Sequence, residues 1–188
     1  MISWLAKIIF LRLMGWTIEG EFPQLKKFIV AVFPHTRNMD FIIGVMTRTI
    51  LDEKISYVGK KELFNPFTGW FFKALGGTPI NRSSNENNVS AIAQIFKENE
   101  TYRMAIAPEG TRKKVDRWKT GFYYIAILAE VPILAVNFNY AKKKVSFLKL
   151  FYPTGDIEKD FKEMKYCFDQ SMQTWIVKGS VLNFLIAF

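Results

Sequence analysis

The sequence holds a single histidine, His35, and an aspartate, Asp40, follows it after four intervening residues in PHTRNMD. An imidazole titrates near neutral pH and can therefore accept a proton from a reacting group. A carboxylate bonded to the other ring nitrogen fixes the tautomer and stabilises the imidazolium that forms. The pair is therefore a candidate general base, and a histidine with a purely structural role is the alternative.

Five positions turn a straight helix through about 500°, so His35 and Asp40 cannot share one face of a helix. Their side chains can meet only if His35 lies in a loop and Asp40 lies in the first turn of the following helix. The flanking residues fit this arrangement. KKFIVAVF (26–33) is an apolar run with β-branched residues, which predicts a buried strand, and MDFIIGVMTRTIL (39–51) has helical spacing.

A second candidate segment, APEGTRKK (107–114), follows another apolar run and carries Glu109, Gly110, Thr111 and Arg112. A glycine lets the backbone turn tightly, and the planar fork of an arginine matches the oxygens of a phosphate. Taken alone, this segment could equally be an ordinary surface turn.

GGTPINR (76–82) predicts a turn, a strand and a basic tip that contains Asn81 and Arg82. A solvated surface arginine is the alternative for that tip. In VGKK, Lys60 and Lys61 point to opposite faces of a strand, so at most one of them can face a site.

Strands alternate with helices along the chain, which predicts a single-domain α/β sandwich with a mostly parallel central sheet flanked by helices. In such a sheet, ligands collect at the carboxyl ends of the strands. His35, Arg82 and Glu109 each follow a predicted strand and should therefore converge on one edge. The remaining expected elements are strands in 54–60, 102–107 and 131–140 and helices in 62–75 (broken at Pro66), 87–100 and 121–130.

Composition narrows the possible partners. The 188 residues have the length of one domain, and their net charge of +9 favours an anionic membrane, a phosphorylated substrate or nucleic acid. The basic residues are scattered and no RNA-binding signature accompanies them, so we expect no nucleic-acid partner. One histidine and one cysteine, Cys167, cannot supply a zinc site, and we expect no metal. A single cysteine also fits a reducing, cytosolic-side location.

Residues 1–16 (MISWLAKIIFLRLMGW) are expected to form an amphipathic helix at the membrane interface. The helix would be about 20 Å long, which is too short for a hydrocarbon core of about 30 Å. Lys7 and Arg12 lie near the margin of its apolar face, and Trp4 and Trp16 favour the interface. A helix packed on the core of the domain is the alternative. For the apolar C-terminal segment SVLNFLIAF (180–188) the alternatives are likewise contact with lipid and packing on the core of the domain.

Taken in order, HTRNMD, GGTPINR, APEGTR and VPILAV resemble the four motifs of the glycerolipid acyltransferase family. The best-known members of that family are the 1-acylglycerol-3-phosphate (lysophosphatidic acid) acyltransferases. The intervening segments YVGKKELF, GWFFKALGG and RWKTGFYYIA are also similar. The likeness covers roughly residues 30 to 140 and is to a compact bacterial branch of the family. It identifies 17–188 as an acyltransferase domain.

The resemblance implies transfer of an acyl group from acyl-CoA or acyl carrier protein to a hydroxyl of a lysophospholipid, without a cofactor. It makes His35 the general base and Asp40 the residue that orients it, with direct attack on the thioester. Glu109, itself an anion, would hold Arg112 or a backbone amide in place. The residues that map onto the acceptor-phosphate region are Lys60, Asn81, Arg82, Glu109, Gly110, Thr111 and Arg112.

Two departures from the family pattern concern the acceptor. Thr36 and Arg37 follow the histidine where the family often has serine in the second position, and no aspartate precedes Arg82. The expected acyl acceptor is 1-acyl-sn-glycerol-3-phosphate. Another lysolipid, such as an aminolipid, and a thioester hydrolase with the same His–Asp pair are the alternatives. The apolar acyl chains of both substrates imply contact with membrane lipids and peripheral attachment to the cytoplasmic face of the cell membrane. The sequence does not indicate an oligomeric state.

Overall fold

The computed structural model of the chain describes residues 2–80, 85–111, 115 and 117–184. Within them, strands form one sheet in the order β1-β7-β6-β2-β5-β3-β4. All neighbouring strands are parallel except β6 and β7, so the expected mostly parallel α/β sandwich is confirmed. The strands are β1 (Thr17–Glu19), β2 (Lys27–Val32), β3 (Ser56–Lys60), β4 (Gly77–Ile80), β5 (Tyr102–Ile106), β6 (Ile133–Asn139) and β7 (Lys144–Phe151).

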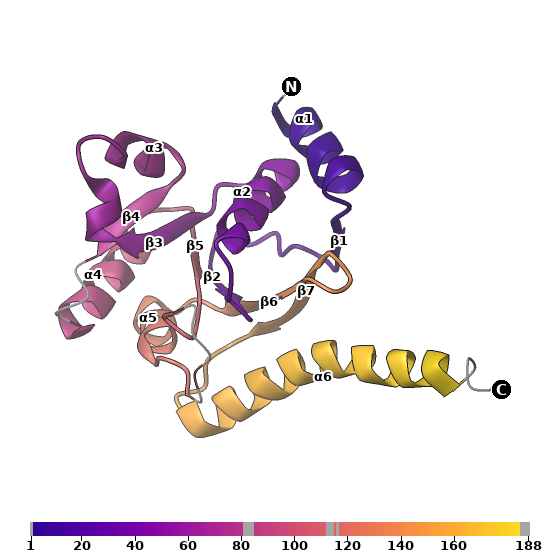
Figure 1. The fold of residues 1–188 in the computed structure, drawn as a ribbon. Helices are drawn as coiled ribbons and strands as arrows, with labels where there is room; N and C mark the ends of the chain where they lie inside the picture. The colour runs from indigo at the N-terminus through magenta and orange to yellow at the C-terminus, as the bar shows by residue number, and fades with distance from the viewer. Residues whose placement is uncertain (1, 81–84, 112–114, 116, 185–188) are drawn as a thin grey trace.

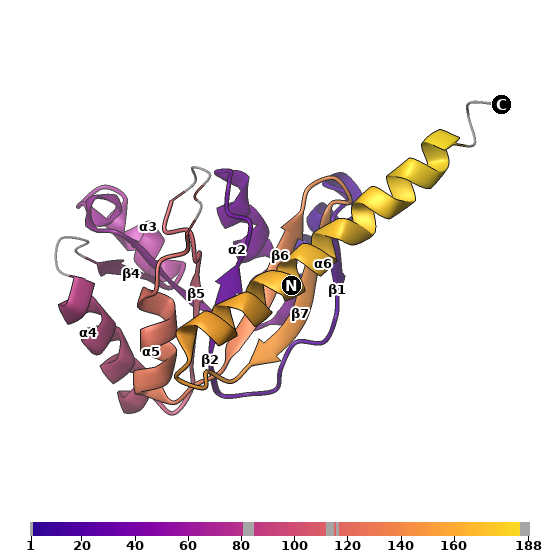
Figure 2. The same ribbon diagram turned by 90° about the horizontal axis from the view of Figure 1, so that it is seen from below.

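Helices cover both faces of the sheet: α1, α2 and α3 lie on one face, and α4, α5 and α6 lie on the other (Figures 1 and 2). The α-helices are α1 (Ile2–Ile8), α2 (Met39–Leu51), α3 (Gly69–Ala74), α4 (Asn85–Glu98), α5 (Gly121–Ala129) and α6 (Ile157–Phe184). A π-helical segment, η1 (Ile9–Leu13), continues α1, and a 3-10 turn, η2 (Lys61–Phe64), precedes α3. In the described part of the chain, no helix combines the length and the apolar character needed to cross a bilayer.

Strand β2 lies at the centre of the sheet and explains why its sequence is a continuous apolar run. Phe28 and Val30 belong to the hydrophobic cluster on the α1–α2 side. Ile29 and Ala31 belong to the cluster on the α4–α6 side. Because helices cover both faces, neither set of alternating side chains reaches water, and the strand needs no polar positions. This buried strand delivers the loop that contains the histidine.

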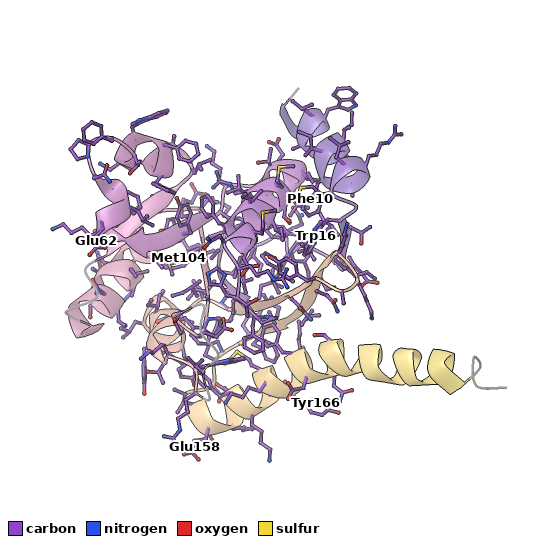
Figure 3. All side chains as sticks on the ribbon, viewed as in Figure 1. Phe10, Trp16, Glu62, Met104, Glu158 and Tyr166 are labelled. Carbon is purple, nitrogen blue, oxygen red and sulfur yellow. The ribbon has the colours of Figure 1, made fainter. Side chains whose placement is uncertain are left out.

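The N-terminal helix divides its apolar residues between the core and the surface. Phe10 is fully buried and its ring lies 6.1 Å from that of Trp16, which is also buried between α1 and the sheet (Figure 3). Trp4 is 67% exposed and Leu13 is exposed as well. Trp16 therefore gives no support to an interfacial helix, and that part of the sequence reasoning is wrong. The interface role of residues 1–16 stays a prediction that now depends on the exposed side chains.

The long C-terminal helix α6 was not expected from the sequence. Its first half packs on the α4–α6 side through Phe161, Met164 and Phe168, which recur at helical spacing. The ring of Phe168 contacts Phe33 at 5.3 Å, just before the histidine loop. The helix then continues past the edge of the sheet (Figures 1 and 2). Its packed half therefore supports the segment that leads from β2 to the candidate site.

Candidate active site

The structure gives His35 and Asp40 the arrangement that their spacing requires. Strand β2 ends at Val32, a cis peptide bond joins Phe33 to Pro34, and His35 follows in the loop. Asp40 lies in the first turn of α2. The Nδ1 atom of His35 is 3.0 Å from Oδ2 of Asp40, and the aspartate side chain is 1% exposed against 24% for the imidazole. Because Nδ1 faces the carboxylate, Nε2 is left to accept a proton.

Asp40 is held as an anion by three donors. Besides the imidazole, the backbone N–H of Arg37 donates to Oδ2 at 2.8 Å, and the hydroxyl of Tyr140 donates to Oδ1. Burial opposes ionisation, but the hydrogen bonds from His35, Tyr140 and the Arg37 amide outweigh it and lower the pKa of Asp40. A buried, hydrogen-bonded carboxylate of this kind can stabilise a positive charge on the imidazole.

Glu109 comes from the neighbouring strand and contacts the histidine loop. It follows β5, which pairs in parallel with β2, and both of its carboxyl oxygens accept the backbone N–H of His35, at 3.0 and 3.2 Å. The residue is 4% exposed. Burial raises its pKa to about 7, the amide of His35 lowers it, and the negative charge of Asp40 adds to the increase. Of the two tasks expected for Glu109, holding a backbone amide is the one that the geometry supplies.

The other expected site residues are described only in part. Gly110 has a φ of 64°, so the tight turn after β5 uses the left-handed backbone that glycine tolerates, and Thr111 follows it. Lys60 is the last residue of β3, whose parallel neighbour is β5, so its backbone lies at the same edge of the sheet as Glu109. Asn81, Arg82 and Arg112 lie outside the described residues.

Comparison with known proteins decides the family. The model of the Acyltransferase family matches residues 16–139, about two thirds of the chain. The chain belongs to this family. The matched range includes His35, Asp40 and Glu109 and ends one residue before Tyr140.

Several curated relatives carry the same name, 1-acyl-sn-glycerol-3-phosphate acyltransferase. The protein from Salmonella typhimurium is 31% identical over 122 residues, which cover 62% of this chain and 49% of the relative. The Escherichia coli protein is 30% identical over a range of the same length. The Haemophilus influenzae protein is 29% identical over 144 residues, which cover 71% of this chain and 58% of the relative. The chain thus spans about half the length of the curated relatives it matches. No solved structure matches it.

Tyr140 is the member of this candidate site that sequence reasoning missed. It lies directly after β6, the other parallel neighbour of β2, and its hydroxyl donates to Asp40. The guanidinium of Arg37 lies 4.5 Å from the centre of its ring, and Trp16 packs edge-on against it at 5.1 Å. The rule that placed His35 and Glu109 at the carboxyl edge of the sheet applies equally to a residue that follows β6. That rule was the signal that could have found Tyr140.

A second buried tyrosine–aspartate pair lies at the opposite edge of the sheet. The hydroxyl of Tyr123 donates to Asp160 at 2.8 Å, and the backbone N–H of Thr154 donates to the same carboxyl oxygen at 2.7 Å. Burial raises the pKa of Tyr123 to about 12. Thr154 follows the end of β7, and this end pairs with Ile133 at the start of β6. The pair therefore ties α5 to α6 and has no contact with the histidine loop among the described residues.

Proposed function

We propose that this chain transfers a fatty acyl group from a thioester to a hydroxyl of a lysophospholipid, with 1-acyl-sn-glycerol-3-phosphate as the favoured acceptor. The observation that carries the proposal is the position of His35 Nδ1 at 3.0 Å from the buried carboxylate of Asp40, which leaves Nε2 as the base. The acceptor named for the relatives supports 1-acyl-sn-glycerol-3-phosphate.

The reaction proceeds in one displacement at the thioester carbonyl. Nε2 of His35 takes the proton of the acceptor hydroxyl while the hydroxyl oxygen attacks the carbonyl carbon of the thioester. The carbon–sulfur bond then breaks, the thiolate takes the proton back from the imidazolium, and an ester and a free thiol are released. The anion of Asp40 stabilises the imidazolium between the two proton transfers. The backbone N–H groups of Arg37 and Gly110 are already engaged, with Asp40 and with the carbonyl of Ala107, which leaves the amides of Thr36 and Asn38 as candidates for the tetrahedral oxygen.

Glu109 acts as a positioning residue in this proposal. Its hydrogen bonds to the His35 amide fix the loop that aims the imidazole. Cationic and polar groups at the same edge would bind the acceptor phosphate, since arginine and lysine match its charge. The proposed phosphate-binding residues are Lys60, Asn81, Arg82, Gly110, Thr111 and Arg112. Acyl-CoA or acyl carrier protein supplies the acyl group, and no further cofactor is needed.

The acyltransferase is proposed to work at the cytoplasmic face of the cell membrane, attached peripherally. Residues 1–16 would lie in the interface, and the exposed side chains of Trp4, Leu5 and Leu13 support this role. Lys7 and Arg12 are exposed on the same segment and would meet anionic headgroups.

Thiol release from palmitoyl-CoA in detergent tests the function directly. Wild type should release thiol only when 1-acyl-sn-glycerol-3-phosphate is present, and His35→Ala should lower the rate by about 10²–10⁴-fold. Tyr123→Phe, at the opposite edge, is the matched control and should keep the rate. Release without an acceptor would identify a thioester hydrolase. Release only with another lysolipid, such as an aminolipid, would change the acceptor and keep the chemistry.

A further inference from the structure

Large aromatic side chains are exposed unevenly over the two faces of the domain. Among the residues whose side chains the structure describes, the exposed tryptophans and phenylalanines all belong to α1 and to the segment around α3, on the same face of the sheet (Figure 1). Elsewhere among the side chains that the structure describes, the exposed large apolar residues are Met39 and Ile42 in α2, Leu128, and three tyrosines, Tyr124, Tyr152 and Tyr166. Isolated exposed residues are ordinary, but a concentration of this kind marks an interaction surface.

The densest part of this surface is the α3 turn, which we define by Leu63, Phe67, Trp70 and Phe71. Phe67 is 88% exposed and Trp70 is 70% exposed. Phe67 lies in the connection between η2 and α3, and Trp70 lies three residues later in the first turn of α3. A monomeric domain gains nothing in stability from holding two large rings in water, so the exposure needs another cause.

Hydrogen bonds within the α3 turn hold its backbone and one of its exposed rings in place. Oδ1 of Asn65 accepts the backbone N–H groups of Phe67 and Thr68, at 2.9 and 3.0 Å, and the hydroxyl of Thr68 donates to the carbonyl of Leu63 at 2.8 Å. The indole N–H of Trp70 donates to the carbonyl of Phe67 at 3.1 Å. A ring held in place before it binds loses little conformational freedom on binding, so the turn is preorganised for contact.

The inner side of the turn is fixed next to the candidate active site. Phe72 packs against Phe64 and Phe41, with ring centres 6.1 Å apart in each pair, and the hydroxyl of Tyr57 donates to the carbonyl of Phe72 at 3.2 Å. Phe41 directly follows Asp40 in α2. Whatever the α3 turn contacts is therefore held close to the histidine and its aspartate.

Charge indicates what that contact is. Exposed Lys61 and Lys73 flank the turn, and the single acidic residue between them is Glu62, which points into solvent (Figure 3). A bilayer with anionic lipids offers headgroups to the lysines and an apolar boundary to the rings, and tryptophan is the residue typical of that boundary. A second copy of the chain fits less well, because two facing turns would bring like charges together.

We propose that the α3 turn is a membrane anchor, which inserts Phe67 and Trp70 into the interface of an anionic bilayer. It acts separately from residues 1–16 and sets the depth at which the histidine loop meets the lipid acceptor. This last step rests on the proposed function, whereas binding to a bilayer does not.

Sedimentation of the full chain with vesicles of equimolar phosphatidylglycerol and phosphatidylcholine tests the anchor. Phe67→Ser and Trp70→Ser should each weaken partitioning about ten-fold, the effect of withdrawing one large ring from an apolar environment. Tyr152→Ser with Tyr166→Ser removes two other exposed rings and should leave binding within about two-fold of wild type, since neither ring reaches the bilayer. Lys61→Glu should weaken binding to these vesicles more than binding to pure phosphatidylcholine.

Unchanged binding in the Phe67 and Trp70 variants would overturn the anchor, and so would a wild type that does not sediment with vesicles. A dimer in light scattering that the two variants dissociate, with vesicle binding unchanged, would assign the surface to self-association and also overturn it. Thiol release with a short-chain, monomeric lysophospholipid separates the anchor from the function. A Phe67 or Trp70 variant that no longer binds vesicles but still releases thiol with this acceptor supports the anchor. If wild type releases no thiol with this acceptor, the proposed function is refuted and the anchor is not.

Discussion

Glu109→Gln should stabilise the domain above neutral pH and change its stability little in acid. The buried carboxyl group has a pKa raised to about 7, against an ordinary value of 4.5 that applies when the chain is unfolded. Between these two values the folded state binds more protons than the unfolded state, so the free energy of unfolding falls as the pH rises. The difference between the two pKa values corresponds to about 3 kcal/mol. Glutamine does not ionise and escapes this loss.

Urea unfolding, followed by circular dichroism at about pH 4.5 and about pH 8, measures the effect. The free-energy difference between the glutamine variant and wild type should grow by about 3 kcal/mol from the lower to the higher pH. Comparing the two proteins at each pH removes the contribution of every other titrating group. Glu62→Gln, which removes an exposed carboxyl group, is the control. A difference that stays constant between the two pH values would refute the assignment of Glu109 as a buried carboxyl with a raised pKa.

Tyr140→Phe removes a hydroxyl donor from Asp40 and should lower kcat with little change in KM. Tyr123→Phe, the control, should destabilise the fold and keep kcat. Equal losses of kcat in the two variants would contradict a positioning role for Tyr140. Phe10→Ala should cost about 3–5 kcal/mol in urea unfolding, because its ring is fully buried, while Trp4→Ala should cost far less. Cys167→Ala should keep acyl transfer. Because burial raises the pKa of the Cys167 thiol, its alkylation at about pH 8 should be slower in the folded protein than in urea.

Local sequence patterns were sufficient for the central strands and for the pairing of histidine with aspartate. The apolar run 26–33 became β2, and the helical pattern at 39–51 became α2 with its first residue as expected. The five-position spacing of His35 and Asp40 allowed one arrangement, a loop followed by a first turn, and the chain adopts it. These features are set by neighbours along the chain, which is why the sequence is informative there.

Features set by contacts distant in the sequence were missed or misread. Tyr140 reaches Asp40 across 100 residues, because β6 lies beside β2, and a local pattern does not reveal which strands become neighbours. Trp16 looked like an interface residue, yet it is buried and the rings of Phe10 and Tyr140 pack against it. The α6 pattern was overlooked because its apolar positions, such as Phe161, are separated by charged residues on the outer face.

The burial of Phe10 changes how shortened versions of this protein should be interpreted. Deleting residues 1–13 to obtain a more soluble sample would remove the core side chain of Phe10 along with the exposed side chains. The cavity would open beside Trp16, whose ring packs on Tyr140, and Tyr140 holds Asp40. An inactive truncated protein would thus report a disturbed active site as readily as a lost attachment to lipid. Point changes at exposed Trp4 separate the two effects, and a deletion does not.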